Sequence, residues 1–212
     1  MTAITDGYLA AATTAADLLA EPAVARRWAT PSALPGMSVS ALAGHLARQI
    51  FSVEALLAQG SCDQRPISLL DHYARVPWID AGLDDEPNVG VRRDGATEAA
   101  AGPVTLAARA RAAIARLSGS LASQPPDRVV LLPWGPWALM LDDLLITRML
   151  EIAVHGDDLA HSTGLPTPAL SADVADTVVG LLSRLAARRH GTTAVLRALS
   201  RAERAPATIT AF

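Results

Sequence analysis

Residues 38–59, SVSALAGHLARQIFSVEALLAQ, carry the clearest structural pattern in the chain. Their apolar side chains recur at steps of three and four residues, at Val39, Leu42, Leu46, Ile50, Val53 and Leu57. This is the period of an α-helix that packs one face on a core. Either Ser38 or Ser40 can accept a free amide of the first turn, so the pattern predicts a helix over about residues 40–59.

Similar periodicity predicts four more helices, over about residues 3–20, 104–123, 143–162 and 171–189. Asp142 or Asp143 is expected to cap the 143–162 helix, which ends near Gly164. Two short apolar runs on either side of Gly135 predict a small hairpin or extended excursion before that helix.

The remaining segments are turn-rich. Residues 60–98 are expected to form a long polar connection with one short helix around 67–75, and connections of this length often wall or cover a site. The end of the chain is ambiguous, and its last six residues could form an edge strand.

These elements predict an all-α fold, most simply a four-helix bundle with a small hairpin excursion. We expect residues 1–165 to form the bundle, and residues 166–212 to form a short C-terminal extension of a helix and a tail packed on it.

Composition narrows the class of protein. Half of the 212 residues are hydrophobic, which is typical of a globular chain, and no apolar run approaches the roughly 20 residues of a membrane span. The net charge is −3 and the basic residues, all arginine, are scattered, so we expect no nucleic-acid partner. The single cysteine, Cys62, fits a reducing cytoplasm, where we expect this protein as a monomer or homodimer.

Residues 147–164, TRMLEIAVHGDDLAHSTG, hold the most suggestive polar residues. Glu151 and His155 are one helical turn apart and about 40° apart in direction, and Asp158 lies on the same line to within about 20°. One interpretation is an ordinary solvated helix face, on which Arg148 pairs with Glu151. The other is that Glu151 and His155 are two ligands of a metal ion.

His45 could supply a third ligand. It lies about 60° from Leu42, at the edge of the apolar stripe, and the small residues ALAG at 41–44 would let another helix approach. A hydrogen-bonded core histidine is the alternative. If the 40–59 and 143–162 helices are neighbours, two imidazoles and one carboxylate can converge, leaving a fourth position on Zn²⁺ or a similar ion open.

Two separated blocks resemble the DinB/YfiT-like metalloenzyme superfamily and, within it, the mycothiol-dependent maleylpyruvate isomerase family. The first block comprises Trp28, Pro31, Pro35-Gly36-Met37-Ser38-Val39, Leu42 and His45-Leu46. The second comprises Arg148, Glu151, Val154-His155-Gly156, Asp158-Leu159-Ala160 and Gly164. The resemblance covers roughly residues 3–165 and implies an up-down-down-up four-helix bundle. It also implies that His45, Glu151 and His155 bind a divalent metal, usually zinc.

The resemblance further implies a low-molecular-weight thiol, mycothiol, as co-substrate. Its thiolate would attack a small electrophilic substrate, giving an S-conjugate or, after bond rotation and loss of the thiol, a cis–trans isomer. Among supporting residues, Asp158 could orient His155 or be a surface charge, and Arg148 could hold a substrate carboxylate, although we favour pairing with Glu151.

Other residues near the predicted site are more ambiguous. His72, Tyr73 and Trp78 can line a binding pocket, but a solvent-exposed loop histidine is the favoured interpretation of His72. Cys62 is expected to be an inert surface thiol, because no base accompanies it.

Two further functions stay open from the sequence: a metal-dependent hydrolase, and a non-catalytic module with a structural metal or none. Family members that isomerise maleylpyruvate, as the resemblance implies, carry a larger C-terminal α/β domain, whereas about 50 residues follow Gly164 here. We therefore expect thiol transfer to another electrophile to be at least as good an assignment as isomerisation.

Overall fold

The 38–59 stretch forms helix α3 (Val39–Leu57) in a computed structural model that describes residues 2–60 and 62–212. Of the two serines proposed as caps, Ser38 is the N-cap: its hydroxyl accepts from the Ala41 amide at 3.2 Å. The predicted stripe is buried on the core side, with Leu42, Leu46 and Ile50 fully inaccessible. The predicted helix is therefore confirmed.

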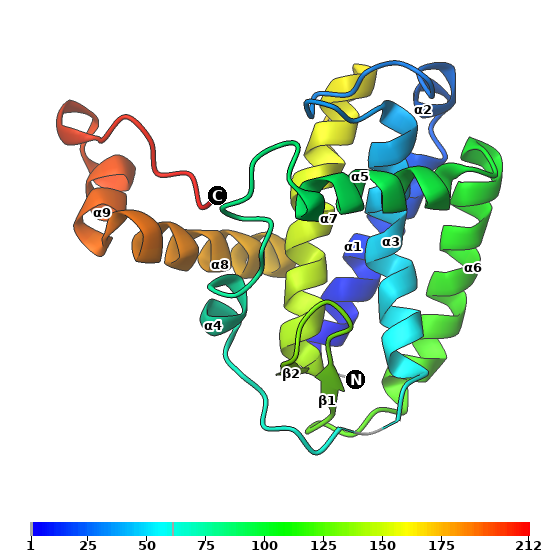
Figure 1. Cartoon of the computed structure of the whole chain (residues 1–212), viewed down its shortest axis with the longest axis horizontal. Coiled ribbons are helices and arrows are strands. Elements are labelled where there is room, and N and C mark those ends of the chain that lie inside the picture. Colours follow the sequence, from blue (N-terminus) through cyan, green and yellow to red (C-terminus); the bar gives the residue numbers. More distant parts are fainter. Residues whose placement is uncertain (1, 61) are drawn as a thin grey trace.

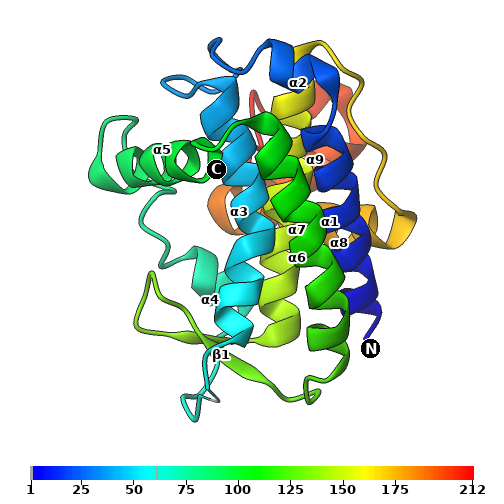
Figure 2. The same cartoon turned by 90° about the vertical axis from the view of Figure 1, so that its right-hand side faces the viewer.

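Three other long helices contact α3 or one another: α1 (Ala3–Leu19), α6 (Pro103–Ala122) and α7 (Leu141–Thr163). Figures 1 and 2 show these four helices running side by side along much of their length. Their facing sides form one hydrophobic core, whose fully buried members include Tyr8, Leu106, Leu117, Leu144 and Met149. The predicted all-α class is confirmed, while the up-down-down-up bundle order stays a prediction.

Helix α7 begins two residues earlier than predicted. Its N-cap is Met140, which makes no side-chain capping bond, and both Asp142 and Asp143 lie in the first turn. Asp142 instead accepts a hydrogen bond from the Thr2 hydroxyl at 3.1 Å, which ties the helix to the start of α1. The predicted end is confirmed, because Gly164 adopts the left-handed conformation with φ 72°.

The predicted hairpin is confirmed, and it explains why α7 starts early. Strands β1 (Val129–Leu131) and β2 (Ala138–Met140) pair antiparallel, with Val130 opposite Leu139, and β2 leads directly into the helix. The short helix α4 (Leu69–Tyr73) is held beside the hairpin, because the Ile67 amide donates to the Ala138 carbonyl at 3.0 Å.

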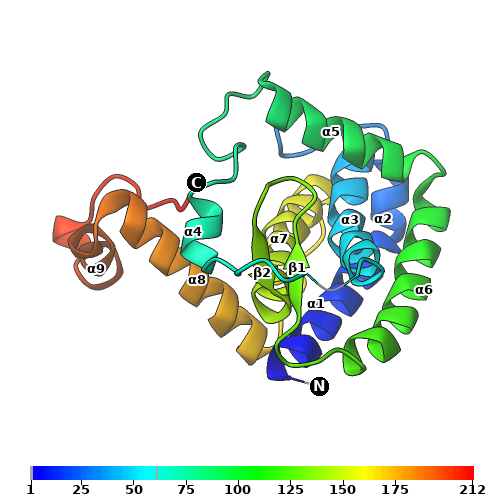
Figure 3. The same cartoon turned by 60° about the horizontal axis from the view of Figure 1, so that its bottom comes forward.

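The prediction of a loop throughout the rest of residues 60–98 is wrong, because Glu86–Ala99 forms helix α5. Its sequence, EPNVGVRRDGATEA, has no apolar stripe, so periodicity could not reveal it. The helix is stabilised by packing across α3 (Figure 3). A Cβ on Gly44 would collide with the Gly95 carbonyl, and a Cβ on Gly95 would collide with the Ala41 carbonyl. The small 41–44 segment therefore does admit another helix, as its sequence suggested.

The C-terminal part contains helices α8 (Ala172–His190) and α9 (Thr192–Ser200), followed by a short 3₁₀ helix, η1 (Ala202–Arg204). Helix α8 contacts α7 and projects away from the side occupied by α6 (Figures 1 and 3). In the N-terminal part, the short helix α2 (Pro22–Arg26) follows α1. Within the described residues, no helix combines the length and hydropathy that a membrane crossing requires.

The suggestion of an edge strand at the end of the chain is wrong, since residues 207–212 adopt no strand. The segment returns toward the connection between α4 and α5 (Figure 1). There the Phe212 ring packs against Trp78 and Tyr73, with centroid distances of 5.1 and 5.8 Å. This aromatic packing, together with a hydrogen bond between Nε2 of His190 and the Thr210 carbonyl at 2.8 Å, holds the segment in place of a sheet edge.

Candidate metal centre

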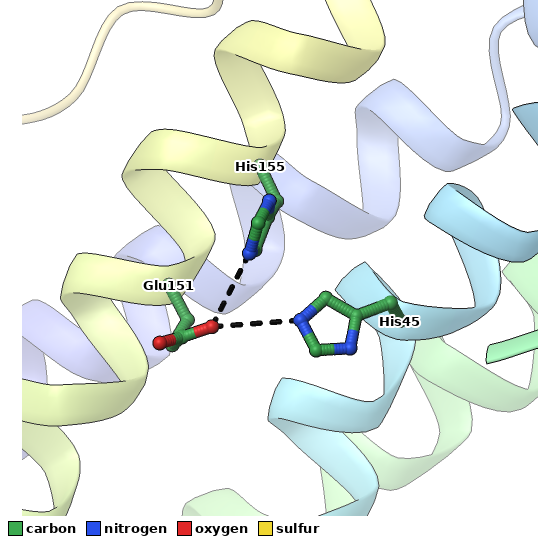
Figure 4. A group of neighbouring side chains, drawn as sticks. All are labelled: His45, Glu151 and His155. Atoms are coloured by element: carbon green, nitrogen blue, oxygen red, sulfur yellow. Dashed lines mark ion pairs between the residues drawn. The ribbon is translucent and has the colours of Figure 1, made fainter. Parts of the chain in front are cut away.

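His45, Glu151 and His155 converge between α3 and α7 (Figure 4). The Oε2 atom of Glu151 lies 3.5 Å from Nε2 of His45 and 3.3 Å from Nε2 of His155. The two imidazole rings meet edge to face, with centroids 4.7 Å apart. One donor atom from each residue lies within 4.8 Å of those of the other two. The convergence expected from two stretches about 100 residues apart is therefore present.

These side chains are largely buried. The exposed fractions are 12% for His45, 13% for Glu151 and 20% for His155. The solvated-face interpretation of the Glu151 and His155 pair is therefore wrong. Helix α7 buries apolar side chains elsewhere on its surface and turns this polar line toward α3 rather than toward water.

Burial and mutual contact shape the electrostatics. Burial alone would raise the pKa of Glu151, but hydrogen bonds to His155 and His45 hold that pKa well below its usual range. Burial lowers the pKa of His45. For His155, burial also acts downward, yet contacts with Asp158 and Glu151 outweigh it and raise the pKa to about 9. The cluster thus keeps a buried carboxylate ionised and favours a cation beside it.

Asp158 lies behind His155. Its Oδ2 atom is 3.0 Å from Nδ1 of His155, the ring nitrogen that faces away from Glu151. An ionised carboxylate can only accept, so Nδ1 is the donor. A proton fixed on Nδ1 leaves Nε2 available as a ligand atom when the imidazole is neutral, which is the usual arrangement behind a metal-bound histidine.

The donor set fits a tetrahedral ion. Nitrogen and oxygen ligands lie about 2.0–2.2 Å from Zn²⁺, so two of them in a tetrahedron are about 3.3–3.5 Å apart. The separations of 3.5 and 3.3 Å between Oε2 of Glu151 and the Nε2 atoms of His45 and His155 have this size. Two imidazoles and one carboxylate are also a known catalytic zinc ligand set, which leaves one position open.

Arg148 does not have the predicted partner. Within the described residues it forms no ion pair with Glu151; its guanidinium donates to Oε1 of Gln49 at 2.6 Å and lies over the Trp134 ring at 5.4 Å. Gln49 in turn donates to the His45 carbonyl at 2.9 Å. Gln49 therefore links Arg148 to the helix turn that carries His45, a role the sequence analysis missed, although Gln49 lies four residues after His45.

Two cavities meet at the cluster, and both are lined by His45, Glu151, Trp78 and Val91. The first, about 390 Å³, we call the polar cavity. Its other walls include Arg48, Gln49, Ser52, His72, Tyr73 and Arg148. The second, about 300 Å³, we call the apolar cavity. Its other walls include Leu34, Pro35, Met37, Leu150, Val154 and Phe212.

The three predicted pocket residues all line a cavity: His72 and Tyr73 the polar one, and Trp78 both. The favoured interpretation of His72 as exposed is wrong, since only 2% of it is accessible. Its Nδ1 accepts from the Trp137 indole at 3.0 Å. Burial, aided by the charge of Arg148, lowers the pKa of His72 to about 4, so the ring is neutral near pH 7.

Two buried hydroxyls of the polar cavity have no hydrogen-bond partner among the described residues, those of Ser52 and Tyr73. Ser52 was not anticipated, yet it lies seven residues after His45 and thus on nearly the same line of α3. Unsatisfied buried hydroxyls are costly, so a ligand that supplies partners would be favoured here. Cys62 lines neither cavity.

Comparison with known families agrees with this geometry. Residues 9–160 match the family model described as mycothiol maleylpyruvate isomerase N-terminal domain. The matched span includes all three residues of the cluster, together with Asp158 and Arg148. Searches of curated proteins and of solved structures returned no match.

Proposed function

Because the chain belongs to the mycothiol maleylpyruvate isomerase N-terminal domain family, we propose that it is a metal-dependent enzyme that uses mycothiol or a similar small thiol. His45, Glu151 and His155 would hold the divalent ion, with zinc as the first choice. The observation that carries the proposal is the buried cluster itself, which supplies three ligand atoms and opens into two cavities.

A zinc ion at this position would offset the charge of a thiolate and so lower the pKa of the incoming thiol. Asp158 would keep Nδ1 of His155 protonated and its ring oriented, so that Nε2 faces Glu151. Asp158 is thus a positioning residue in this account.

The polar cavity would bind the thiol co-substrate. The guanidinium of Arg148 offers hydrogen bonds to a hydroxyl- and amide-rich molecule. The unpaired, buried hydroxyls of Ser52 and Tyr73 would add others once the cavity wall shifts to expose them to the ligand. Arg148 is held in place by Gln49 rather than by Glu151, which favours a role in binding a ligand over the pairing with Glu151 that the sequence suggested. His72 would shape this wall as a neutral ring, and Trp78 would contact both ligands.

Two reactions use these groups equally well. In transfer, the sulfur forms a bond to an electrophilic carbon, the leaving group departs with its electron pair, and the thiol proton passes to solvent. In isomerisation, the sulfur adds to a conjugated double bond, the resulting single bond rotates, and the thiol is expelled again. We propose transfer, which the sequence analysis rated at least as good an assignment as isomerisation.

A structural metal is less well supported. Structural zinc sites are closed by a fourth protein ligand, and the two residues that could supply it here, Asp158 and His72, have other partners. Asp158 bonds to Nδ1 of His155, and Nδ1 of His72 accepts from Trp137.

The experiment is a calorimetric titration of zinc-loaded protein with mycothiol, and with its analogue in which serine replaces cysteine. We expect mycothiol to bind at least tenfold more tightly than the analogue, because only the thiol can reach the ion. The Tyr73→Phe variant should weaken both ligands alike. Equal binding of mycothiol and its serine analogue to the wild type would contradict thiol activation and favour the hydrolase alternative.

A further inference from the structure

The apolar cavity lies on the other side of the cluster from the groups assigned to the thiol. Outside the cluster, its polar lining side chains are Asn88 and Arg92. The Asn88 amide donates to the carbonyls of Ala81 and Gly82, at 3.1 and 3.0 Å. It is therefore committed to holding the loop that precedes α5.

Arg92 is committed to the same loop. Its guanidinium donates to the Leu83 carbonyl at 2.6 Å and forms an ion pair with Asp84 at 3.5 Å. A carboxylate entering this cavity would find each cationic side chain of its lining already paired, Arg92 with Asp84 and His155 with Glu151 and Asp158. Burying the unpaired charge of such a ligand would be strongly unfavourable. The apolar surface of a ligand, by contrast, would be stabilised by contact with the Leu34, Val154 and Phe212 side chains.

From this contrast we infer that the second substrate is an uncharged, mainly apolar electrophile bound in the apolar cavity, with its reactive carbon toward Glu151 and His45. This inference rests on the proposed function and specifies its substrate class. A cavity of about 300 Å³ is at the small end for ligand sites and so suits a small molecule of up to about three rings. Because both cavities reach the same two ligand residues, thiol and electrophile would meet at the cluster from opposite sides.

The reaction balances without another reactant. The sulfur of the thiol forms a bond to the electrophilic carbon, and a halide or similar group leaves with the bonding electron pair. The thiol proton goes to solvent. The product released from the apolar cavity is then a conjugate in which the hydrophilic thiol molecule is attached to the electrophile.

The binding test uses two fluorescent probes that differ by one charged group. N-phenyl-1-naphthylamine is neutral, and 8-anilinonaphthalene-1-sulfonate is the same skeleton with a sulfonate. When each probe is titrated into the metal-free protein, the neutral probe should bind one site per chain at least tenfold more tightly than the sulfonate. Equal or tighter binding of the sulfonate would overturn the inference.

Variants locate the site. Leu34→Asp places a charge in the apolar cavity wall and should weaken the neutral probe at least tenfold. Leu196→Asp is the matched control, because Leu196 is 64% exposed on α9 and lines neither cavity, and it should change binding less than twofold. If Leu34→Asp loses its helical circular dichroism, Val154→Asn decides in its place. Unchanged binding in the folded cavity variant would refute the location.

A turnover assay separates this inference from the function on which it rests. Zinc-loaded protein and mycothiol are supplied with methyl 4-chloro-3,5-dinitrobenzoate, which is neutral, or with the corresponding free carboxylate, 4-chloro-3,5-dinitrobenzoate. We expect the neutral halide to be conjugated at least tenfold faster, after correction for the uncatalysed rates. Preference for the carboxylate would overturn the substrate class and leave the proposed function standing. If the neutral probe binds selectively but neither halide is conjugated, the proposed function is contradicted. The apolar cavity would then still be a site for an uncharged ligand.

Discussion

The carboxylate of Asp158 has a single task in this account, which is to hold Nδ1 of His155. Asp158→Asn removes its negative charge, and an amide can present its NH₂ group to the ring as readily as its oxygen. We expect zinc affinity to fall by about 10–100-fold, the usual cost of losing such a contact, as measured by competition with a chromophoric chelator. Asp157→Asn is the matched control, because Asp157 is exposed and bonds to Thr167 instead. Equal affinities in the two variants would refute the role of Asp158.

His72 should make stability depend on pH. Its pKa is about 4 in the folded protein and about 6.5 when unfolded, so the unfolded chain binds more protons between these values. The stabilisation is complete above pH 6.5 and is lost as the pH falls toward 4. By pH 4.5 we expect the wild type to lose about 2 kcal/mol more of its free energy of unfolding than His72→Gln, as measured in urea. Parallel pH curves for the two proteins would contradict this.

At this scale the sequence was informative where helical spacing relates the residues to one another. His45, Glu151 and His155 could be predicted because helical spacing places them on lines that can face each other. The partner of Arg148 and the burial of His72 could not, because each depends on a residue from another element: Gln49 on α3 and Trp137 beside β2.

Among the helices, α5 depends most on its neighbour. Gly95→Ala would push a methyl group into the Ala41 carbonyl, so α5 must move away from α3. Overpacking of this kind costs about 1–3 kcal/mol, and we expect a loss of that size in the free energy of unfolding. Binding of both the thiol and the neutral probe should also weaken, since α5 residues line both cavities.

The matched control for this substitution is Gly119→Ala on α6, where a methyl group meets nothing within 4 Å. Replacing a glycine inside a helix by alanine without a clash should stabilise the protein by about 0.5–1 kcal/mol. Destabilisation of similar size in both variants would mean that the α3–α5 contact is not what Gly95 provides.

Helix α5 also shows why whole helices can be harder to predict from the sequence than single site residues. Helices α1, α3 and α6 could be predicted from their apolar stripes, because these stripes all face one core. Helix α5 covers the outside of α3 through glycine backbone contacts, which leave no apolar period to detect. Its sequence signals were Asp85 before Pro87 at the start, and the small residues at 41–44 of the partner helix.

At the scale of the whole molecule, the C-terminal segment folds back onto the apolar cavity, which Phe212 helps to line. Phe212→Ala should release this segment, because its ring contacts Trp78 and Tyr73. We expect trypsin to cleave after Arg201 and Arg204 several-fold faster than in the wild type, as followed by mass spectrometry. Leu199→Ala, at a side chain that is 72% exposed, is the control and should leave the cleavage rate unchanged. A wild-type rate in Phe212→Ala would show that the aromatic packing does not hold the segment.

The two cavities belong to this largest scale as well. The apolar cavity is assembled from the 34–37 loop, α5, α7 and Phe212, which are scattered over most of the chain. Sequence spacing cannot bring such segments together, so the ligand cluster was predictable, whereas of the cavity walls only His72, Tyr73 and Trp78 were predicted.

The central claim is that His45, Glu151 and His155 hold one metal ion. The most direct test is the metal content of protein purified without a histidine tag and incubated with zinc, measured by mass spectrometry. We predict about one ion per chain in the wild type, loss of the ion in His45→Ala and in His155→Ala, and full retention in His161→Ala, whose side chain is exposed on the same helix. A wild type without metal, or equal metal in all four proteins, would contradict the account.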